Sequence, residues 1–92
     1  MKAMMYNYTA WINEVNPEVL NSTYIEKLTN AGFEILNKVE KHFEPHGYTC
    51  LYLLAESHFA VHTFPEQNTT YIELSSCVEK PFNVFIAGVG NQ

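Results

Sequence analysis

Five side chains in the second half of the sequence could together perform chemistry. Ser57 is a potential nucleophile, with Glu56 before it, His58 after it, and His62 and Cys77 five and twenty residues later. Such a set supplies a nucleophile, a base and a proton donor. A hydrolase triad is weakly supported, because the sequence has no G-x-S-x-G motif and the acid would have to be a glutamate. The combination indicates that Ser57 is present for chemistry.

Two histidine spacings could suggest a metal, His42 and His46 with Cys50 nearby, and His58 with His62. Zinc needs four ligands that converge within about 2.0–2.3 Å of the ion. Positions 58 and 62 of one extended strand would lie roughly 13 Å apart, so a shared ion would need a sharp turn between them. We therefore predict no metal site.

Turn residues and apolar periodicity divide the chain into the elements that must position these side chains. Residues 4–15 alternate as a strand does, and an Asn-Pro pair at 16–17 interrupts them. Asn21 or Ser22 is the expected helix N-cap, and Gly32 the expected left-handed end of that helix. Residues 33–43 fit either a helix or a strand. The further expected strands cover residues 48–56, 59–64, 69–77 and 82–89.

These elements predict an α+β fold, a two-layer sandwich in which a helix packs on one face of an antiparallel sheet. Residues 1–92 form one domain with a modest core, so assembly with a second copy would add stability. Residues 48–56 are apolar on both faces, which predicts a central strand covered on both sides.

Composition excludes several classes of function. The net charge is −5, and the charged residues are ten glutamates and five lysines without arginine or aspartate, which argues against nucleic-acid binding. The apolar runs are too short for a membrane span, and the N-terminal residues do not resemble a signal peptide. We expect a cytoplasmic protein in which Cys50 and Cys77 are reduced thiols.

The residues around Ser57 also form a spaced pattern. In chain order it consists of Phe43, Pro45 to Gly47, Thr49, Ala55 to His58, His62 to Glu66, and Cys77. This pattern resembles the small prokaryotic type of the S-adenosylmethionine decarboxylase proenzyme family. Residues 16–21 are similar to the segment that precedes the first helix of that family. The match is strong from residue 43 to residue 77, and a set of this length is far more specific than one Ser-His pair.

The resemblance implies self-cleavage between residues 56 and 57. The Ser57 hydroxyl would attack the Glu56 carbonyl, His62 would be the processing base, and Thr49 would supply a hydroxyl that assists. After elimination and loss of ammonia, Ser57 becomes a pyruvoyl group at the start of a chain of residues 57–92, held to residues 1–56 by the shared sheet. Neutral imidazole suits the role of His62 near neutral pH.

The resemblance also implies the reaction of the processed protein. The pyruvoyl cofactor would form a Schiff base with S-adenosylmethionine and accept electrons as carbon dioxide leaves, in the pathway to spermidine and other polyamines. Cys77 would return a proton to the substrate, Phe43 would stack on adenine, and Glu66 would hold the ribose hydroxyls. Family members are commonly homodimers, and a homodimer is expected here.

The sequence departs from the family pattern after Cys77. Val78 stands where the family usually has glycine, the first strand lacks the usual Gly and Asp, and only fifteen residues follow Cys77 (92 − 77) where the family continues through another helix and strand. This predicts a C-terminally shortened member whose sheet is exposed on one face or covered by a partner. Two alternatives stay open, a pyruvoyl decarboxylase of another amino acid and a non-catalytic homologue that binds a ligand or partner.

One geometric condition follows for the chemistry. Side chains 57 and 62 point to opposite faces of an unbroken strand, because the side-chain period of a strand is two. We therefore expect the chain to turn or bulge between Ser57 and His62, or a neighbouring strand to supply the partner.

Overall fold

The computed structural model describes residues 2–89, which fold into one sheet and two α-helices. In chain order the elements are β1 (Tyr6–Ile12), α1 (Pro17–Ala31), β2 (Ile35–His42), β3 (Tyr48–Leu54), β4 (Ser57–Phe64), the 3-10 turn η1 (Pro65–Gln67), β5 (Thr69–Ser76) and α2 (Glu79–Val89).

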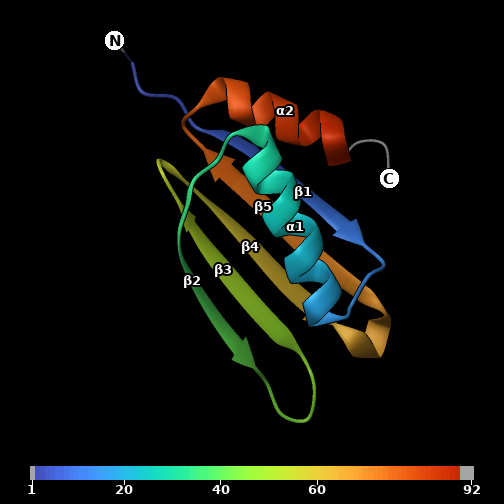
Figure 1. The fold of residues 1–92 in the computed structure, drawn as a ribbon. Coiled ribbons are helices and arrows are strands. Elements are labelled where there is room, and N and C mark those ends of the chain that lie inside the picture. Colours follow the sequence, from blue (N-terminus) through green and yellow to red (C-terminus); the bar gives the residue numbers. More distant parts are fainter. Residues whose placement is uncertain (1, 90–92) are drawn as a thin grey trace.

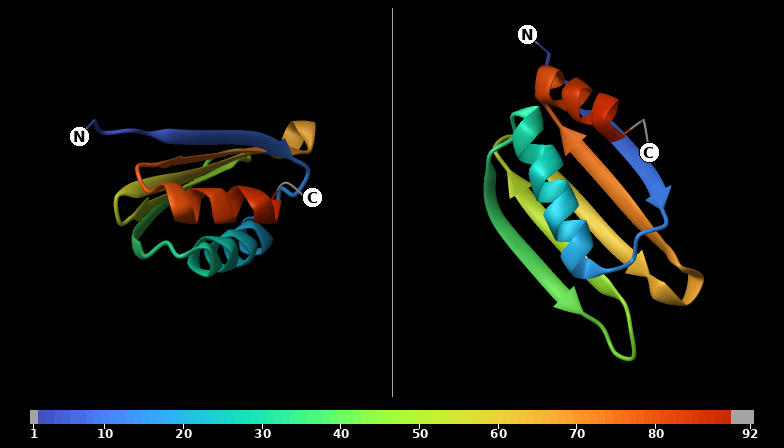
Figure 2. Two further views of the ribbon diagram at one scale, coloured as in Figure 1. Left: turned by 90° about the horizontal axis from the view of Figure 1, so that it is seen from above. Right: turned by 45° about the vertical axis from the view of Figure 1, so that its right-hand side comes forward.

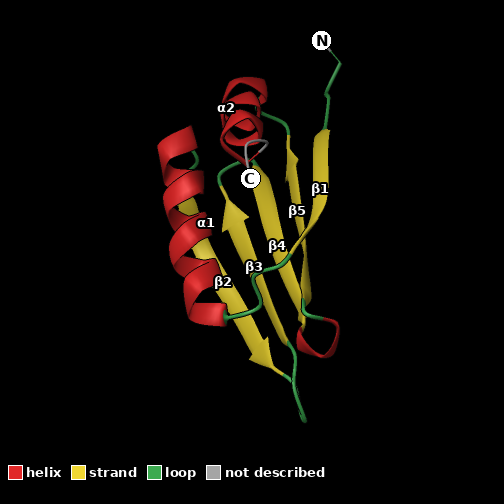
Figure 3. Cartoon of the chain, turned by 90° about the vertical axis from the view of Figure 1, so that its right-hand side faces the viewer, coloured by secondary structure: helices red, strands yellow, loops and turns green. Residues whose placement is uncertain are grey.

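The sheet has the spatial order β1-β5-β4-β3-β2, and all neighbouring strands are antiparallel. β1 and β2 form its two edges, and α1 crosses the sheet diagonally to connect them (Figure 1). Both helices lie on the same face of the sheet (Figures 2 and 3). The predicted two-layer α+β architecture is therefore confirmed.

Helix α1 begins earlier than the sequence indicated. Asn16 is its N-cap, and the Asn16 side chain accepts a hydrogen bond from the Glu18 backbone N–H at 2.9 Å. The predicted caps, Asn21 and Ser22, lie inside the helix. An Asn-Pro pair ends a strand, but it also starts a helix, since proline lacks only an N–H that the first turn does not use. The predicted end is correct, because Gly32 adopts φ 107° in the left-handed region.

Most of the ambiguous residues 33–43 belong to strand β2 (Ile35–His42), whose pairing with β3 has an irregularity between Ile35 and Asn37. Residues 82–89, predicted to be a strand, belong instead to helix α2. Phe82, Phe85 and Val89 are buried on one side of it, at the spacing of a helical stripe. The expectation that no helix follows Cys77 is therefore wrong, and α2 covers the sheet beside α1.

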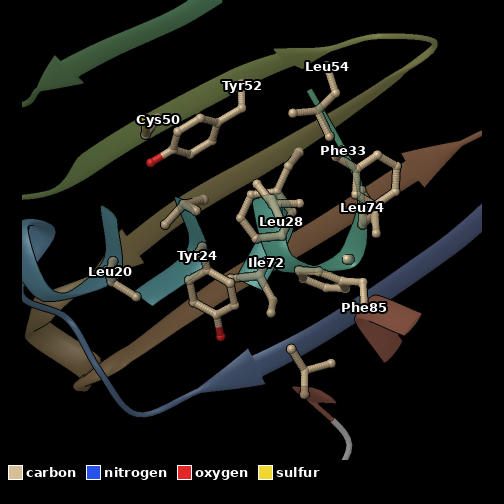
Figure 4. Close-up of a cluster of buried hydrophobic side chains, with 14 of the residues drawn as sticks. Leu20, Tyr24, Leu28, Phe33, Cys50, Tyr52, Leu54, Ile72, Leu74 and Phe85 are labelled. Carbon is tan, nitrogen blue, oxygen red and sulfur yellow. The ribbon is translucent and has the colours of Figure 1, made fainter. Parts of the chain in front are cut away.

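The core lies between the helices and the sheet (Figure 4). Phe59 of β4 is at its centre, 5.2 Å from the Tyr24 ring of α1 and 5.6 Å from the Phe85 ring of α2. Burial of such rings is the main stabilising term for a small domain, at about 25 cal/mol per Å² of apolar surface.

The other side of the sheet, which we call the open face, carries no helix of the described chain. β3 is therefore covered on one side only, contrary to the prediction, and Leu51 and Leu53 are 46% and 53% exposed. Its alternating burial is typical of an antiparallel strand with one solvated face. The large apolar side chains exposed on this face are Trp11, Val39, Leu51, Leu53 and Phe64.

Candidate functional site

The bond between Glu56 and Ser57 lies in a tight turn that joins β3 to β4. Leu54 and Ser57 are directly paired, so Ala55 and Glu56 form a two-residue connection. Glu56 adopts φ 62°, a left-handed conformation that is unusual for a residue with a side chain. Such a conformation costs on the order of 1–3 kcal/mol and is characteristic of functional sites. The strained residue is therefore the one whose carbonyl the Ser57 hydroxyl is expected to attack.

Three groups approach the Glu56 carbonyl oxygen. The Ser57 hydroxyl donates to it at 2.6 Å, the Cys77 thiol at 3.0 Å and the Cys77 backbone N–H at 3.3 Å. Two donors from the end of β5 thus surround the oxygen that would become negative if the Ser57 hydroxyl attacked this carbonyl. Donors preorganised around a developing charge are an effective way to lower a barrier.

Ser76 is a site residue that the sequence analysis did not single out. It lies opposite Ser57 on β5, and the two hydroxyls are 2.7 Å apart. Ser76 is fully buried and is held by the start of the next segment, where its hydroxyl accepts from the Val78 backbone N–H at 3.0 Å. A serine before the cysteine carries no motif by itself, so only the pairing of β4 with β5 could reveal this contact.

A second group of candidate residues lies at the other end of the sheet. Thr49 and His62 are directly paired across β3 and β4, and Thr49 Oγ1 lies 3.0 Å from His62 Nδ1. Phe43 is half exposed in the loop between β2 and β3, and the Glu66 carboxylate of η1 lies 3.2 Å from His46 Nε2. These five side chains line one pocket of about 290 Å³.

The two groups do not meet within one chain. β4 pairs with both neighbours in register from Ser57 to Phe64, so the predicted turn or bulge between Ser57 and His62 is absent. Five residues of strand separate their Cα atoms by roughly 16 Å, and the two side chains point to opposite faces. The other expectation is that a neighbouring strand supplies the partner of Ser57. It fits the structure, because the groups nearest to Ser57 come from β5 and the residue after it. Figure 1 shows the β3–β4 turn and the β2–β3 loop at opposite ends of the sheet.

His58 is the imidazole nearest to Ser57 in sequence. It is exposed, points to the open face, and lines an apolar pocket of about 320 Å³ that includes Val39, Leu51 and Leu53. No three His, Cys, Asp or Glu side chains gather as metal ligands would within residues 2–89. Within the same residues, neither helix is long and apolar enough to cross a membrane.

A partly buried polar network connects β3 to α1 and to the edge strand β2. The Tyr48 hydroxyl donates to Glu40 at 2.5 Å and accepts from the Asn21 amide at 2.7 Å, while the Tyr52 hydroxyl donates to the Asn21 carbonyl oxygen. Burial raises the pKa of both tyrosines, and the hydrogen bond from Tyr48 lowers the pKa of Glu40. Both tyrosines therefore stay neutral donors near pH 7, and they hold the strand that presents Thr49.

The fold and the strained Glu-Ser turn define a class of protein, a two-layer α+β sandwich with a candidate self-cleavage site at one end of its sheet. Comparison with known proteins agrees with that class. Residues 7–87 match the family model described as S-adenosylmethionine decarboxylase. The match includes all or most of every element of the fold and all candidate residues of both groups, so the chain belongs to the S-adenosylmethionine decarboxylase family.

Individual relatives cover less of the chain. S-adenosylmethionine decarboxylase proenzyme 2 of Bacillus anthracis is 49% identical over 47 residues, which are 51% of this chain and 38% of that protein. The proenzyme of Archaeoglobus fulgidus is 36% identical over 74 residues, or 75% of this chain and 66% of that protein. The chain thus aligns with 38% to 66% of the length of these two relatives.

A solved structure extends the likeness in fold. The crystal structure of the adenosylmethionine decarboxylase from Aquifex aeolicus superposes with a TM-score of 0.72 at 20% identity, covering 98% of this chain and 83% of that one. At this identity the likeness concerns the fold alone. It agrees with the five-stranded antiparallel sheet and two helices described above.

Proposed function

We propose that this chain is the precursor of a pyruvoyl-dependent S-adenosylmethionine decarboxylase that serves polyamine synthesis, and that it cleaves itself between Glu56 and Ser57. The observation that carries the proposal is the convergence of the Ser57 hydroxyl, the Cys77 thiol and the Cys77 N–H on the Glu56 carbonyl oxygen, at 2.6, 3.0 and 3.3 Å. Family membership supports it, because several relatives are themselves proenzymes.

Self-cleavage would begin when Ser57 Oγ attacks the Glu56 carbonyl carbon. The Glu56 oxygen becomes an oxyanion, which the two Cys77 donors stabilise. The C–N bond then breaks, the nitrogen of Ser57 takes up a proton, and an ester joins the two residues. Relief of the left-handed conformation at Glu56 would favour this step.

A base would next remove the α-proton of Ser57. The electron pair left on the α-carbon expels the Glu56 carboxylate, which becomes the new C-terminus of residues 1–56. The dehydroalanine at position 57 tautomerises to an imine, and water releases its nitrogen as ammonia and leaves the pyruvoyl carbonyl. His62 is the proposed base, because its Nδ1 is engaged by Thr49 and an imidazole can take a proton near neutral pH.

The residues around position 57 fit a pyruvoyl group. The position is 8% exposed, and polar side chains from β5 lie beside it. The group would supply an electron-accepting carbonyl for the loss of carbon dioxide, which no amino-acid side chain provides. Cys77 would hold the proton for the substrate α-carbon. Its thiol is exposed and reaches the Glu56 carbonyl oxygen across the turn.

A second copy of the chain would complete the site. His62 and Ser57 belong to one straight strand, so the base for one chain would come from its partner. In a two-fold dimer joined through the open face, residue 57 of one chain would lie over residue 62 of the other and the reverse. The Ser57 side chain points to the helix-covered face, so the partner imidazole would approach the backbone α-carbon of residue 57 from the open face. Such an axis would pass near Ala60, midway between them, whose small side chain on the open face permits close approach.

The open face suits such a dimer. Trp11 and Val39 are 62% and 63% exposed at its two edges, and Leu51 and Leu53 lie between them. Several large apolar side chains exposed on one face favour an interface there. A 92-residue domain also gains most from assembly, because it buries only about 60% of its unfolded surface by itself. We therefore propose a homodimer joined through the open face.

The pocket at the far end would hold the nucleoside of the substrate. Phe43 offers an exposed aromatic face for adenine, and the Glu66 carboxylate can accept hydrogen bonds from two ribose hydroxyls. The net charge of −5 favours a substrate that carries a sulfonium cation. In the proposed dimer this pocket would face the position 57 of the partner chain.

A mass measurement under denaturing conditions tests the proposal. The proenzyme should separate into fragments of residues 1–56 and 57–92, the second beginning with a pyruvoyl group, while Ser57→Ala stays intact. The split protein should release carbon dioxide from S-adenosylmethionine and not from arginine or ornithine. An intact wild-type chain, or a Ser57→Ala chain that splits at the same bond, would contradict self-cleavage. Release from arginine or ornithine instead would contradict the substrate.

A further inference from the structure

His62 stands in an ordered row of side chains on the open face. Directly opposite it on one side is Thr49 of β3, and directly opposite on the other is Tyr71 of β5. The Tyr71 ring is stacked beside the imidazole, with ring centres 6.2 Å apart and planes inclined by 28°. The imidazole is therefore flanked by a hydroxyl on one side and an aromatic ring on the other.

Tyr71 is itself held by two neighbours. Its hydroxyl donates to the Glu73 carboxylate at 2.7 Å, and its ring lies 5.2 Å from the ring of Trp11 on β1. The hydrogen bond to Glu73 raises the pKa of Tyr71, so the phenol remains a donor across the neutral range. These contacts join β1, β5, β4 and β3 across one face of the sheet.

We propose that Tyr71, anchored by Glu73, is a positioning residue for His62. This rests on the proposed role of His62 in self-cleavage. Neither Tyr71 nor Glu73 belongs to the sequence pattern around Ser57, and only the pairing of β4 with β5 brings them to the imidazole.

Positioning is needed because of where His62 lies. A histidine on a sheet face can rotate about two side-chain bonds, and Thr49 restrains only one ring nitrogen. A ring stacked on the other side limits the tilt of the imidazole plane. With Nδ1 next to Thr49, Nε2 forms no hydrogen bond to another side chain of residues 2–89 and is the nitrogen left for proton transfer. A displaced catalytic group can lose roughly a hundredfold in rate from about 1 Å of error.

Two measurements test this inference. The first is the ¹⁵N and NOE spectrum of the His62 ring in a Ser57→Ala background, which keeps the chain uncleaved. We expect a single tautomer with contacts to Thr49 and Tyr71, and loss of both features in Tyr71→Ala. Tyr71→Phe keeps the ring but loses the anchor to Glu73, so it should retain the ring contacts in weakened form, as should Glu73→Gln. Val39→Ala, which alters the open face at its edge, should leave them unchanged.

The second measurement is the rate of self-cleavage with Ser57 present. Tyr71→Ala should slow it roughly ten- to hundredfold, and Tyr71→Phe should restore most of the rate, because the ring rather than the hydroxyl contacts His62. A His62 spectrum unchanged by Tyr71→Ala would overturn the inference whether or not the protein cleaves. Thr49, His62 and Tyr71 belong to one chain, so the spectrum is decisive in either assembly state, and failure of wild-type cleavage alone would contradict the proposed function only.

Discussion

The two ends of β4 hold different parts of the proposed reaction. At the turn end, Ser57 lies against a strained carbonyl that also receives the Cys77 thiol. At the far end, His62 pairs with Thr49 beside a pocket of about 290 Å³. In the proposed reaction, the first end would hold the bond to be broken, and the second would hold the base and the nucleoside. Ser57 and His62 are only five residues apart in sequence, but they cannot touch within one chain, because both belong to one straight strand.

The separation also has a consequence for timing. A newly made chain would hold its scissile bond about 16 Å from its own His62, a distance set by the rise of an extended strand. With His62 as the proposed base, the open face would have to meet a second copy before the α-proton of Ser57 could leave. Self-cleavage would then occur only after two copies have assembled, and a monomer would stay intact.

Mixing two inactive chains gives the largest expected effect. Ser57→Ala and His62→Ala should each stay uncleaved alone, but a mixed dimer contains one site with Ser57 from one chain and His62 from the other. With random mixing, roughly half of the His62→Ala chains should split, and the Ser57→Ala chains should all stay intact. Mass spectrometry of co-expressed chains with different tags measures this directly.

The matched control for that experiment is His58→Ala, which removes the imidazole adjacent to Ser57 and should cleave as wild type does. Cleavage of His62→Ala by itself at the wild-type rate would remove His62 from the mechanism. A wild-type protein that cleaves while the mixture does not would show that the base acts within its own chain, against the strand geometry described here.

Cys77→Ala should give the next largest effect, since Cys77 is proposed to act at the turn end in both self-cleavage and decarboxylation. Loss of a general acid lowers turnover by roughly 10²–10⁴-fold. Cleavage should slow less, because the Cys77 backbone N–H still reaches the Glu56 oxygen. The measurement is turnover per cleaved chain, compared with the cleavage rate of the same variant. Cys50→Ala is the control, being a buried thiol away from the turn, and equal turnover in both variants would remove Cys77 as the donor.

Glu66→Gln should sharpen the contrast by acting at the far end only. A hydrogen bond to a charged group contributes about 1.5–3 kcal/mol, so KM for S-adenosylmethionine should rise roughly ten- to hundredfold while cleavage continues at the wild-type rate. Steady-state kinetics on fully cleaved protein give the comparison. Glu26→Gln, on the outer side of α1, is the matched carboxylate control. A slower cleavage with unchanged KM would place Glu66 in processing instead.

Much of this arrangement could be predicted from the sequence. Alternation of side chains predicts β1, β-branched and aromatic residues predict β5, and the motif from Phe43 to Cys77 indicates the family. Helix α2 is not predicted, because residues 82–89 are interpreted as a short strand although Phe82, Phe85 and Val89 recur at helical spacing. Local patterns do not specify which strands pair, so the contacts of Ser57 with Ser76 and of His62 with Tyr71 required the sheet order.

The conformation of Glu56 is likewise invisible in the sequence, since a left-handed residue in a two-residue turn is normally glycine or asparagine. The strain arises because β3 and β4 pair directly up to Leu54 and Ser57, which leaves only two residues to reverse the chain. A glutamate is thus held in a conformation that the strands impose on it. The turn end differs from the far end in this stored strain as well as in its chemistry.

Glu56→Gly tests that difference and should give the smallest effect of the series. Glycine adopts the left-handed conformation without strain, so the free energy of unfolding should rise by about 1 kcal/mol and self-cleavage should slow by roughly fivefold. Denaturant unfolding in a Ser57→Ala background gives the first value, and the rate of fragment formation gives the second. Glu56→Gln keeps the strain and should leave both values near those of the parent chain. If Glu56→Gly cleaves as fast as wild type while becoming more stable, the strain would belong to the turn alone, and the Cys77 donors would account for the reactivity of the bond.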